Sequence, residues 1–140
     1  MKKASEMMVP RERVVTLKPD DDIREAVRKL ASNGVSGAPV LEGETVVGII
    51  SESDITRFLE AARKQTKETA TPIEKASKSK VSSVMTRKVV SVGLDATLGD
   101  IAHLMADRKV NRIVVTDSRK SLLGLVARAD VIRAGLEELQ

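Results

Sequence analysis

The chain has no cysteine, tryptophan or tyrosine, and only one phenylalanine and one histidine among its 140 residues. Without cysteine there are no disulfides, no thiolate nucleophile and no zinc site built on sulfur. The one histidine, His103, falls on the polar face of a predicted helix, so we expect it to be solvated rather than a ligand. Catalysis needs a nucleophile with its base, paired acids or a metal. None of these sets is evident, so we expect neither an enzyme nor a metal site.

A concentrated basic patch and a long apolar run are also missing. The net charge is +4, with acidic and basic residues interspersed. Proteins that read single-stranded nucleic acid add aromatic stacking surfaces to a basic groove, which Phe58 alone does not supply. No apolar stretch approaches the roughly 18 residues of a membrane span, and the N-terminus lacks the apolar region of a secretory signal. We expect a cytoplasmic protein that does not bind nucleic acid.

What the chain does contain is a repeat. The segment that starts VVTLKPDDDIREAV at Val14 returns roughly 75 residues later as VVSVGLDATLGDIA at Val89. Internal similarity of this kind indicates a duplicated structural unit. In the alignment Ser51 and Asp54 fall on Ala127 and Asp130. The duplication therefore keeps one acidic position and changes the polar position beside it.

Each copy predicts the order strand, helix, strand, strand, helix. In the first copy the strands are 14–17, 38–41 and 46–50, and the helices contain 23–30 and 52–63. In the second copy the strands are 89–92, 112–116 and 122–127, and the helices contain 98–106 and 129–139. The order predicts a mixed α/β (α+β) fold. We divide the chain into repeat 1 at 1–66, a polar linker at 67–80 and repeat 2 at 81–140.

Three consecutive carboxylates, Asp20, Asp21 and Asp22, precede the first predicted helix. They allow a metal site, but the start of a helix also favours acidic residues, for capping and for the helix dipole. We favour the cap. Thr97 takes this place in the second copy, and Asn33 and Gly34 are predicted to end the first helix.

Six segments together resemble one known family: VVTLKPDD, GVSGAPVL and VVGIISESDI in the first copy, and VMTRKVVSV, KVNRIVV and LLGLVARADV in the second. In this order and in duplicate they resemble the CBS-domain pair, or Bateman module, of the stand-alone prokaryotic or archaeal type. The similarity covers residues 4–138. It implies tandem CBS repeats packed as a pseudo-twofold pair with two clefts. Similar proteins bind AMP, ADP, ATP or S-adenosylmethionine there as regulatory ligands, with no obligatory cofactor.

The resemblance also implies which residues meet the ligand. In the family a Ser or Thr, followed three residues later by Asp, offers its hydroxyl to phosphate and the carboxylate to ribose. The adenine side of each cleft comes from the opposite repeat. The first cleft would contain Ser51, Asp54, Thr86, Ser91 and Val110. The second cleft would contain Asp130, Thr16, Val35 and Ser36, with Asn111 and Arg112 near the phosphates.

The chemistry of these residues suits such a ligand. A carboxylate has two acceptor oxygens for the two hydroxyls of a ribose, and each charge-assisted bond contributes about 1.5–3 kcal/mol. The free amides at the start of a helix suit a phosphate. The alternative is that SESD is a capping box, with Ser51 as cap and Asp54 at the third helical position, which only stabilises the helix.

The two copies differ in ways that predict unequal clefts. Ala127 removes the hydroxyl from the second cleft, and Arg112 stands where the first copy has Gly37. Arg112 or Arg128 would then meet the phosphates, because the forked arginine donors suit them. Arg112 lying on the surface, with its stem over Val110, is the alternative.

We therefore expect a sensor that passes ligand occupancy to an unidentified protein effector. The wide apolar stripes of 98–106 and 131–139 predict a homodimer formed through helices. Two other functions stay open, a structural interaction module with empty clefts and a basic adaptor for nucleic acid. Nucleic-acid binding that falls steeply with salt, without any response to nucleotides, would favour the adaptor.

Overall fold

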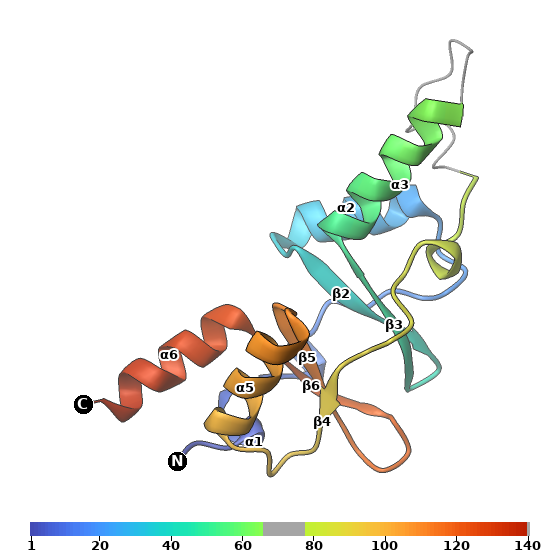
Figure 1. Ribbon diagram of the computed structural model, residues 1–140. Coiled ribbons are helices and arrows are strands. Elements are labelled where there is room, and N and C mark those ends of the chain that lie inside the picture. The colour runs from blue at the N-terminus through green and yellow to red at the C-terminus, as the bar shows by residue number, and fades with distance from the viewer. Residues whose placement is uncertain (66–77, 140) are drawn as a thin grey trace. The chain divides into compact units, whose positions relative to one another are not determined.

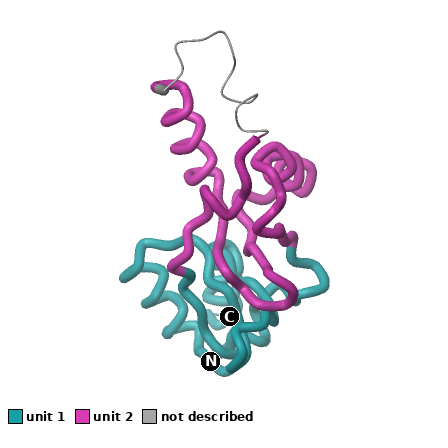
Figure 2. Tube along the Cα trace, turned by 90° about the vertical axis from the view of Figure 1, so that its right-hand side faces the viewer, with its two compact units in different colours: residues 1–14, 89–140 teal, residues 15–88 magenta. Residues whose placement is uncertain are grey.

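The computed structural model describes residues 1–65 and 78–139, which form two compact units. Unit 1 combines Met1–Val14 with Val89–Gln140, and unit 2 is Val15–Lys88 (Figure 2). Of the predicted linker 67–80, residues 67–77 lie outside the described part of the chain. None of the helices in the described residues has the length and hydropathy of a membrane span.

Unit 2 contains the first repeat. It runs through α2 (Ile23–Asn33), β2 (Gly37–Glu42), β3 (Thr45–Ser51) and α3 (Glu52–Gln65), followed by the 3-10 turn η2 (Val81–Ser83). Strands β2 and β3 form an antiparallel hairpin, and Figure 1 shows both helices on the same side of it.

The first strand predicted for this repeat, at 14–17, is reduced to one parallel bridge between Leu17 and Val40. Leu17 bonds to β2 on both sides, through its N–H to Pro39 O at 3.0 Å and its carbonyl to Leu41 N at 2.8 Å. A turn follows at once, because Asp21 N donates to Lys18 O. The chain therefore leaves the sheet to start α2 before a longer ladder can form.

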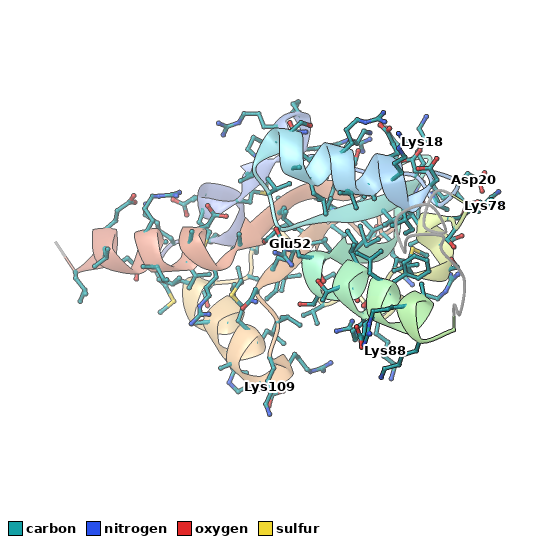
Figure 3. The ribbon with its side chains drawn as sticks, turned by 90° about the horizontal axis from the view of Figure 1, so that it is seen from above. Lys18, Asp20, Glu52, Lys78, Lys88 and Lys109 are labelled. Atoms are coloured by element: carbon teal, nitrogen blue, oxygen red, sulfur yellow. The ribbon has the colours of Figure 1, made fainter. Side chains whose placement is uncertain are left out.

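The acidic run before α2 serves structure. Asp22 Oδ1 accepts a hydrogen bond from Glu25 N at 2.7 Å, which confirms the predicted cap. Asp21 accepts from Lys18 N at 2.8 Å, and Asp20 pairs with Lys80 at 3.2 Å. Figure 3 shows Lys18, Asp20 and Lys78 together around the start of α2. Among the residues described, no group of three or more acidic or histidine side chains is placed to hold a metal ion.

Unit 1 contains the second repeat and the N-terminal residues. Its elements are α1 (Ala4–Met7), β1 (Val9–Pro10), the 3-10 turn η1 (Arg11–Arg13), β4 (Ser91–Val92), α5 (Leu98–Arg108), β5 (Arg112–Thr116), β6 (Leu122–Ala127) and α6 (Arg128–Glu138). The sheet order is β1-β6-β5-β4, with β4 and β5 parallel and the other pairs antiparallel. His103 is exposed on α5, as predicted. Elements α1 and β1 were not predicted, because they are too short to give a periodic pattern.

One short segment in each unit packs in the same way, residues 2–9 in unit 1 and residues 79–86 in unit 2. We call these the lead-in segments. Each forms an antiparallel bridge at the start of a helix and another at the last strand of a hairpin. The bridges at the helices are Lys3 with Thr97 and Lys80 with Asp22. The bridges at the strands are Val9 with Leu125 and Thr86 with Ile49. Val9 therefore occupies the position in unit 1 that Thr86 occupies in unit 2.

The lead-in segments also complete the two hydrophobic cores. In unit 2, Val81 and Met85 pack with residues of α2, β2 and β3. In unit 1, Ala4 and Met7 pack with residues of α5, β5 and β6. A glycine of the facing strand admits the methionine of each lead-in segment, because a Cβ on Gly48 or Gly124 would lie 2.4 Å from the sulfur of Met85 or Met8.

Candidate functional site

The first candidate site lies where β3 ends and α3 begins in unit 2. Ser51 N donates to Asp54 Oδ2 at 3.0 Å, and Asp54 N donates to Ser51 Oγ at 3.3 Å. These reciprocal bonds form the capping box that the sequence allowed. The Ser51 hydroxyl also donates to Asp54 Oδ2 at 3.1 Å. Capping therefore occupies one carboxylate oxygen of a residue that is only 5% exposed.

The other oxygen of Asp54 has two further donors. The Thr86 hydroxyl donates to Asp54 Oδ1 at 3.1 Å, and the Arg57 guanidinium donates to the same oxygen. Thr86 comes from the lead-in segment, and its backbone exchanges two hydrogen bonds with Ile49, at 2.8 and 2.9 Å. The structure thus brings together Ser51, Asp54 and Thr86, which the resemblance placed in one cleft.

The second candidate site lies where β6 ends and α6 begins in unit 1. Ala127 N donates to Asp130 Oδ2 at 2.8 Å, and Arg133 donates to Asp130 Oδ1 at 3.3 Å. Asp130 is 7% exposed, so it is as buried as its counterpart. Alanine has no hydroxyl to donate, and Val9 of the lead-in segment has none either. Unit 1 therefore repeats the backbone and the aspartate of the first site, but it lacks the two hydroxyl donors of Ser51 and Thr86.

In each unit, a loop that contains predicted ligand-binding residues is hydrogen-bonded to the first residue of the helix that carries the aspartate. In unit 2 the carbonyl of Ser36 accepts from Glu52 N at 2.9 Å, and Figure 3 shows Glu52 close to the loop that leaves α2. In unit 1 the carbonyl of Asn111 accepts from Arg128 N at 2.9 Å. Val35 and Val110, which precede these residues, are half-buried. Their assignment to the aspartate of the opposite repeat stays a prediction.

The remaining predicted residues lie on strands or beside them. The Thr16 carbonyl accepts from Lys29 Nζ at 3.2 Å, which ties this residue to α2. Ser91 is exposed on β4. Arg112 begins β5 directly opposite Ala127 and is half-buried, so it lies at the strand ends that precede the Asp130 turn.

A hollow accompanies each turn. In unit 2, a hollow of about 230 Å³ is lined by Asp54, Arg57, Phe58, Ser83 and Val84. In unit 1, a groove of about 490 Å³ runs between α5 and α6. It is lined by Ala102, Met105, Ala106, Lys109, Val110, Asn111, Arg128, Val131 and Ile132. The groove of unit 1 combines an apolar wall with the cations Lys109 and Arg128, whereas the hollow of unit 2 has a single cation, Arg57, beside the carboxylate of Asp54.

Sequence reasoning missed two features of the sites. Arg57 and Arg133 each follow the aspartate by three residues and pair with it, in both repeats. The signal was present in DITR and DVIR. The equivalence of Val9 and Thr86 was missed because two extra residues separate the N-terminal segment from the repeat that follows it.

Two carboxyl groups of unit 1 that lie away from the sites have a lowered pKa. The backbone N–H of Thr97 donates to Asp100, which lowers the pKa of that carboxyl. A hydrogen bond from Lys2 lowers the pKa of Glu137 and ties the N-terminal segment to α6. Both carboxyl groups are exposed, and both are in unit 1.

Comparison with known proteins identifies relatives of the whole pair. Residues 4–61 and 81–137 match the family model described as the CBS domain. The uncharacterized protein MJ1426 of Methanocaldococcus jannaschii is 36% identical over 137 residues, with 82% of each chain covered. Inosine-5'-monophosphate dehydrogenase of Halobacterium salinarum is 30% identical over 133 residues, but these span 94% of this chain and only 24% of the enzyme. That likeness carries no dehydrogenase activity to this chain.

Solved structures agree with the tandem fold. The crystal structure of CBSX2, a protein of Arabidopsis thaliana, in complex with AMP has a TM-score of 0.84 and 27% identity, with 100% of both chains covered. The CBS domain pair of protein MJ0100, in complex with 5-methylthioadenosine and S-adenosylmethionine, has a TM-score of 0.80. At 19% identity over 99% of this chain and 98% of that one, it supports the fold alone.

Proposed function

Because this chain belongs to the CBS-domain family, we propose that it is a regulatory module that binds an adenosine-containing ligand and passes its occupancy to a protein effector. One observation carries the proposal. A buried aspartate opens the last helix of each repeat, and in both repeats its carboxylate is the acceptor that a ribose would need. A likeness to a protein that holds AMP, at 27% identity over the whole chain, supports it.

The ligand would be read by the parts assembled at each turn. The ribose hydroxyls donate to Asp54 or Asp130, and the phosphate or carboxylate of the ligand meets the start of the helix and nearby cations. On the second side these cations are Arg112 and Arg128. Residues of the opposite repeat would cover the adenine. These are Ser91 and Val110 for the Asp54 side, with Thr86 from the lead-in segment, and Thr16, Val35 and Ser36 for the Asp130 side, where Asn111 lies near the phosphates.

A thermal-unfolding panel tests this proposal. AMP, ADP, ATP and S-adenosylmethionine are added to the wild-type protein, with GMP and inorganic phosphate as ligand controls. A ligand at a hundredfold excess over its dissociation constant stabilises the folded state by about 2.7 kcal/mol. We expect at least one adenosine compound to raise the melting temperature and the two controls to leave it unchanged.

Three variants assign the effect to residues. Asp54→Ala and Asp130→Ala should each reduce the ligand-induced shift. Asp100→Ala is the matched control, because Asp100 also caps a helix in its first turn but belongs to α5 and lies away from both sites. No shift with any adenosine compound would refute the proposal. Equal shifts in all three variants and the wild type would instead refute the residue assignment.

The partner surface that we propose for a homodimer is the apolar face of α6. Ile132 is 57% exposed, Leu136 58% and Leu139 85%, on a helix whose other face packs in the core of unit 1. Such a stripe next to the apolar wall of the α5–α6 groove suits a second copy of the chain, because a symmetric contact buries the same stripe twice.

Sedimentation equilibrium tests the dimer. We expect the wild-type protein to associate and Leu136→Lys to shift the equilibrium to the monomer. Leu94→Lys is the matched control, since Leu94 is also exposed in unit 1 but lies before α5 rather than on α6. A monomeric wild-type protein, or equal association of both variants, would contradict this surface.

A further inference from the structure

We infer that the two aspartates are unequal before any ligand arrives: Asp130 is an open acceptor, whereas Asp54 is closed by the hydroxyl groups of Ser51 and Thr86. We call these two hydroxyls the latch. The inference rests on the proposed function, because it concerns the order in which the two sites take a ribose. It predicts that the Asp130 side fills first, although that side lacks the Ser of the family pattern.

The count of donors carries the inference. An ionised carboxylate offers about four lone-pair sites, two on each oxygen. At Asp54 all four are used, by Ser51 N, the Ser51 hydroxyl, the Thr86 hydroxyl and Arg57. At Asp130, within the chain as described, Ala127 N and Arg133 use one site on each oxygen. A ribose needs two acceptor sites, and only Asp130 has two to offer.

The arginines do not account for the difference. Arg57 and Arg133 occupy the same position after the aspartate, pair with the same carboxylate oxygen and expose about as much of their side chains to solvent, 70% and 65%. The backbone N–H of residue 51 or 127 is also the same on both sides. What differs is one hydroxyl on the turn and one on the lead-in segment.

The latch can open without moving the backbone. The main chain of Thr86 stays paired with Ile49 through two hydrogen bonds, and Ser51 is the last residue of β3. Rotation of either side chain about χ1 withdraws its hydroxyl from the carboxylate. A ribose at Asp54 must therefore displace hydrogen bonds to a charged group, which weakens its net binding, while a ribose at Asp130 displaces none of this kind.

The two sides can be exchanged by single substitutions at equivalent positions. Thr86→Val removes one arm of the latch and keeps the shape of the side chain. Val9→Thr places a hydroxyl at the corresponding register of unit 1, next to the strand that leads to Asp130. The first variant should open the Asp54 side and the second should hinder the Asp130 side.

Calorimetric titration with AMP tests these two substitutions in two background variants, each of which retains only one of the two aspartates. In Asp130→Asn, which isolates the Asp54 side, we expect Thr86→Val to tighten AMP binding by about tenfold, since one hydrogen bond to a charged group no longer has to be broken. In Asp54→Asn, which isolates the Asp130 side, we expect Val9→Thr to weaken AMP binding. A purely structural role of Thr86 would leave the affinity unchanged or lower it, and that result would overturn the inference.

A measurement on the wild-type protein makes the test independent of the variants. Ile55 and Val131 directly follow Asp54 and Asp130, so their methyl resonances report on the two turns. During titration with AMP we expect Val131 to saturate at lower ligand concentration than Ile55. With 2'-deoxy-AMP, which lacks one ribose hydroxyl, that lead should shrink. Saturation of Ile55 first, or of both together, overturns the inference while leaving the proposed function intact. If neither resonance responds and no heat is measured, the proposed function fails and the inference fails with it.

Discussion

Units 1 and 2 use the same frame for different local chemistry. In each, a helix opens with a buried aspartate after the last strand of a hairpin, and a lead-in segment crosses that strand at the same register. In unit 2 two hydroxyls turn toward the aspartate, and in unit 1 alanine and valine replace them. The two repeats therefore share the aspartate acceptor and its backbone geometry, but they differ in the number of protein side chains that donate hydrogen bonds to it.

The packing beside the two turns differs in a compensating way. In unit 2 the large Phe58 of α3 and the lead-in residue Val84 line the same hollow and pack against the same core. At the same places unit 1 has Ala134 on α6 and Met7, both buried in its core. A large side chain on one element is matched by a smaller one on the other, as close packing requires. Phe58 and Val84, which line the hollow beside Asp54, are therefore replaced in unit 1 by residues of different size, which are buried in its core.

We expect the largest difference in unfolding free energy from substitutions of Gly48 and Gly124, the two glycines against which the lead-in segments pack. A Cβ at position 124 would lie 2.7 Å from the carbonyl oxygen of Val9, whereas one at position 48 would lie 3.1 Å from that of Thr86. Because paired backbone moves less easily than a side chain, Gly124→Ala should cost about 3 kcal/mol of unfolding free energy and Gly48→Ala about 1 kcal/mol. Urea unfolding followed by far-UV circular dichroism measures both.

Shortening the methionines is the control for this comparison. Each methionine sulfur would lie 2.4 Å from the added carbon, so Gly48→Ala should cost less unfolding free energy in a Met85→Ala background than in the wild-type protein. Met8→Ala should reduce the cost of Gly124→Ala by a smaller amount, because the Val9 carbonyl still blocks the new carbon. Equal losses for the two glycine variants would show that the two crossings are equally tight.

A second comparison removes the charge of each aspartate without ligand. Asp54→Asn weakens bonds from four donors and Asp130→Asn weakens bonds from two. We expect losses of about 2 and about 1 kcal/mol of unfolding free energy, since hydrogen bonds to charged groups are individually modest but cumulative. Chemical unfolding of the ligand-free variants measures them. A larger loss for Asp130→Asn would reverse the order that the donor count gives.

A smaller difference is expected at the first helix of each repeat. Asp22 caps α2 with a bond of 2.7 Å to Glu25 N, and Thr97 caps α5 with a bond of 3.2 Å to Asp100 N. Removal of a cap costs about 0.5–2 kcal/mol, and the shorter, charged cap should lie at the upper end. Asp22→Ala should therefore lower the unfolding midpoint in urea more than Thr97→Ala. The reverse order would show that the reciprocal bond from Thr97 N to Asp100 does not compensate for the lost hydroxyl.

Much of the fold follows from local sequence signals. The second-repeat strands at 112–116 and 122–127 agree with β5 and β6. The predicted acidic cap supplies Asp22 at the start of α2, and of the predicted stop Gly34 is the C-cap while Asn33 is the last helical residue. Two kinds of element escaped. The strand predicted at 14–17 pairs at one residue only, and α1 and β1 are four and two residues long. Their pairing depends on contacts far along the chain, which a periodic pattern does not encode.

The sequence was enough to locate the two turns, but not to predict the hydrogen bonds within them. The spacing of Ser51 and Asp54, repeated as Ala127 and Asp130, marked both turns. The Ser51 hydroxyl donates to Asp54 because of the side-chain rotamer that Ser51 adopts, and the sequence does not determine that rotamer. That Val9 stands in for Thr86 required the register of two antiparallel bridges.

We expect the smallest effect from Asp100 of unit 1, whose titration makes the unfolding free energy depend on pH. The N–H of Thr97 lowers the pKa of Asp100 below the ordinary aspartate value of about 3.9. A carboxyl whose folded pKa is lowered adds stability above its unfolded pKa and loses it as the pH falls through the folded pKa. Asp100→Asn removes this group, so the unfolding free energy of the variant should fall less than that of the wild type between about pH 5 and pH 2. Because the group is exposed, the difference should be smaller than the loss from either cap substitution, and added salt should reduce it further. Urea midpoints measured across this range decide the matter, and parallel curves for the two proteins would show that the Thr97 contact is absent in solution.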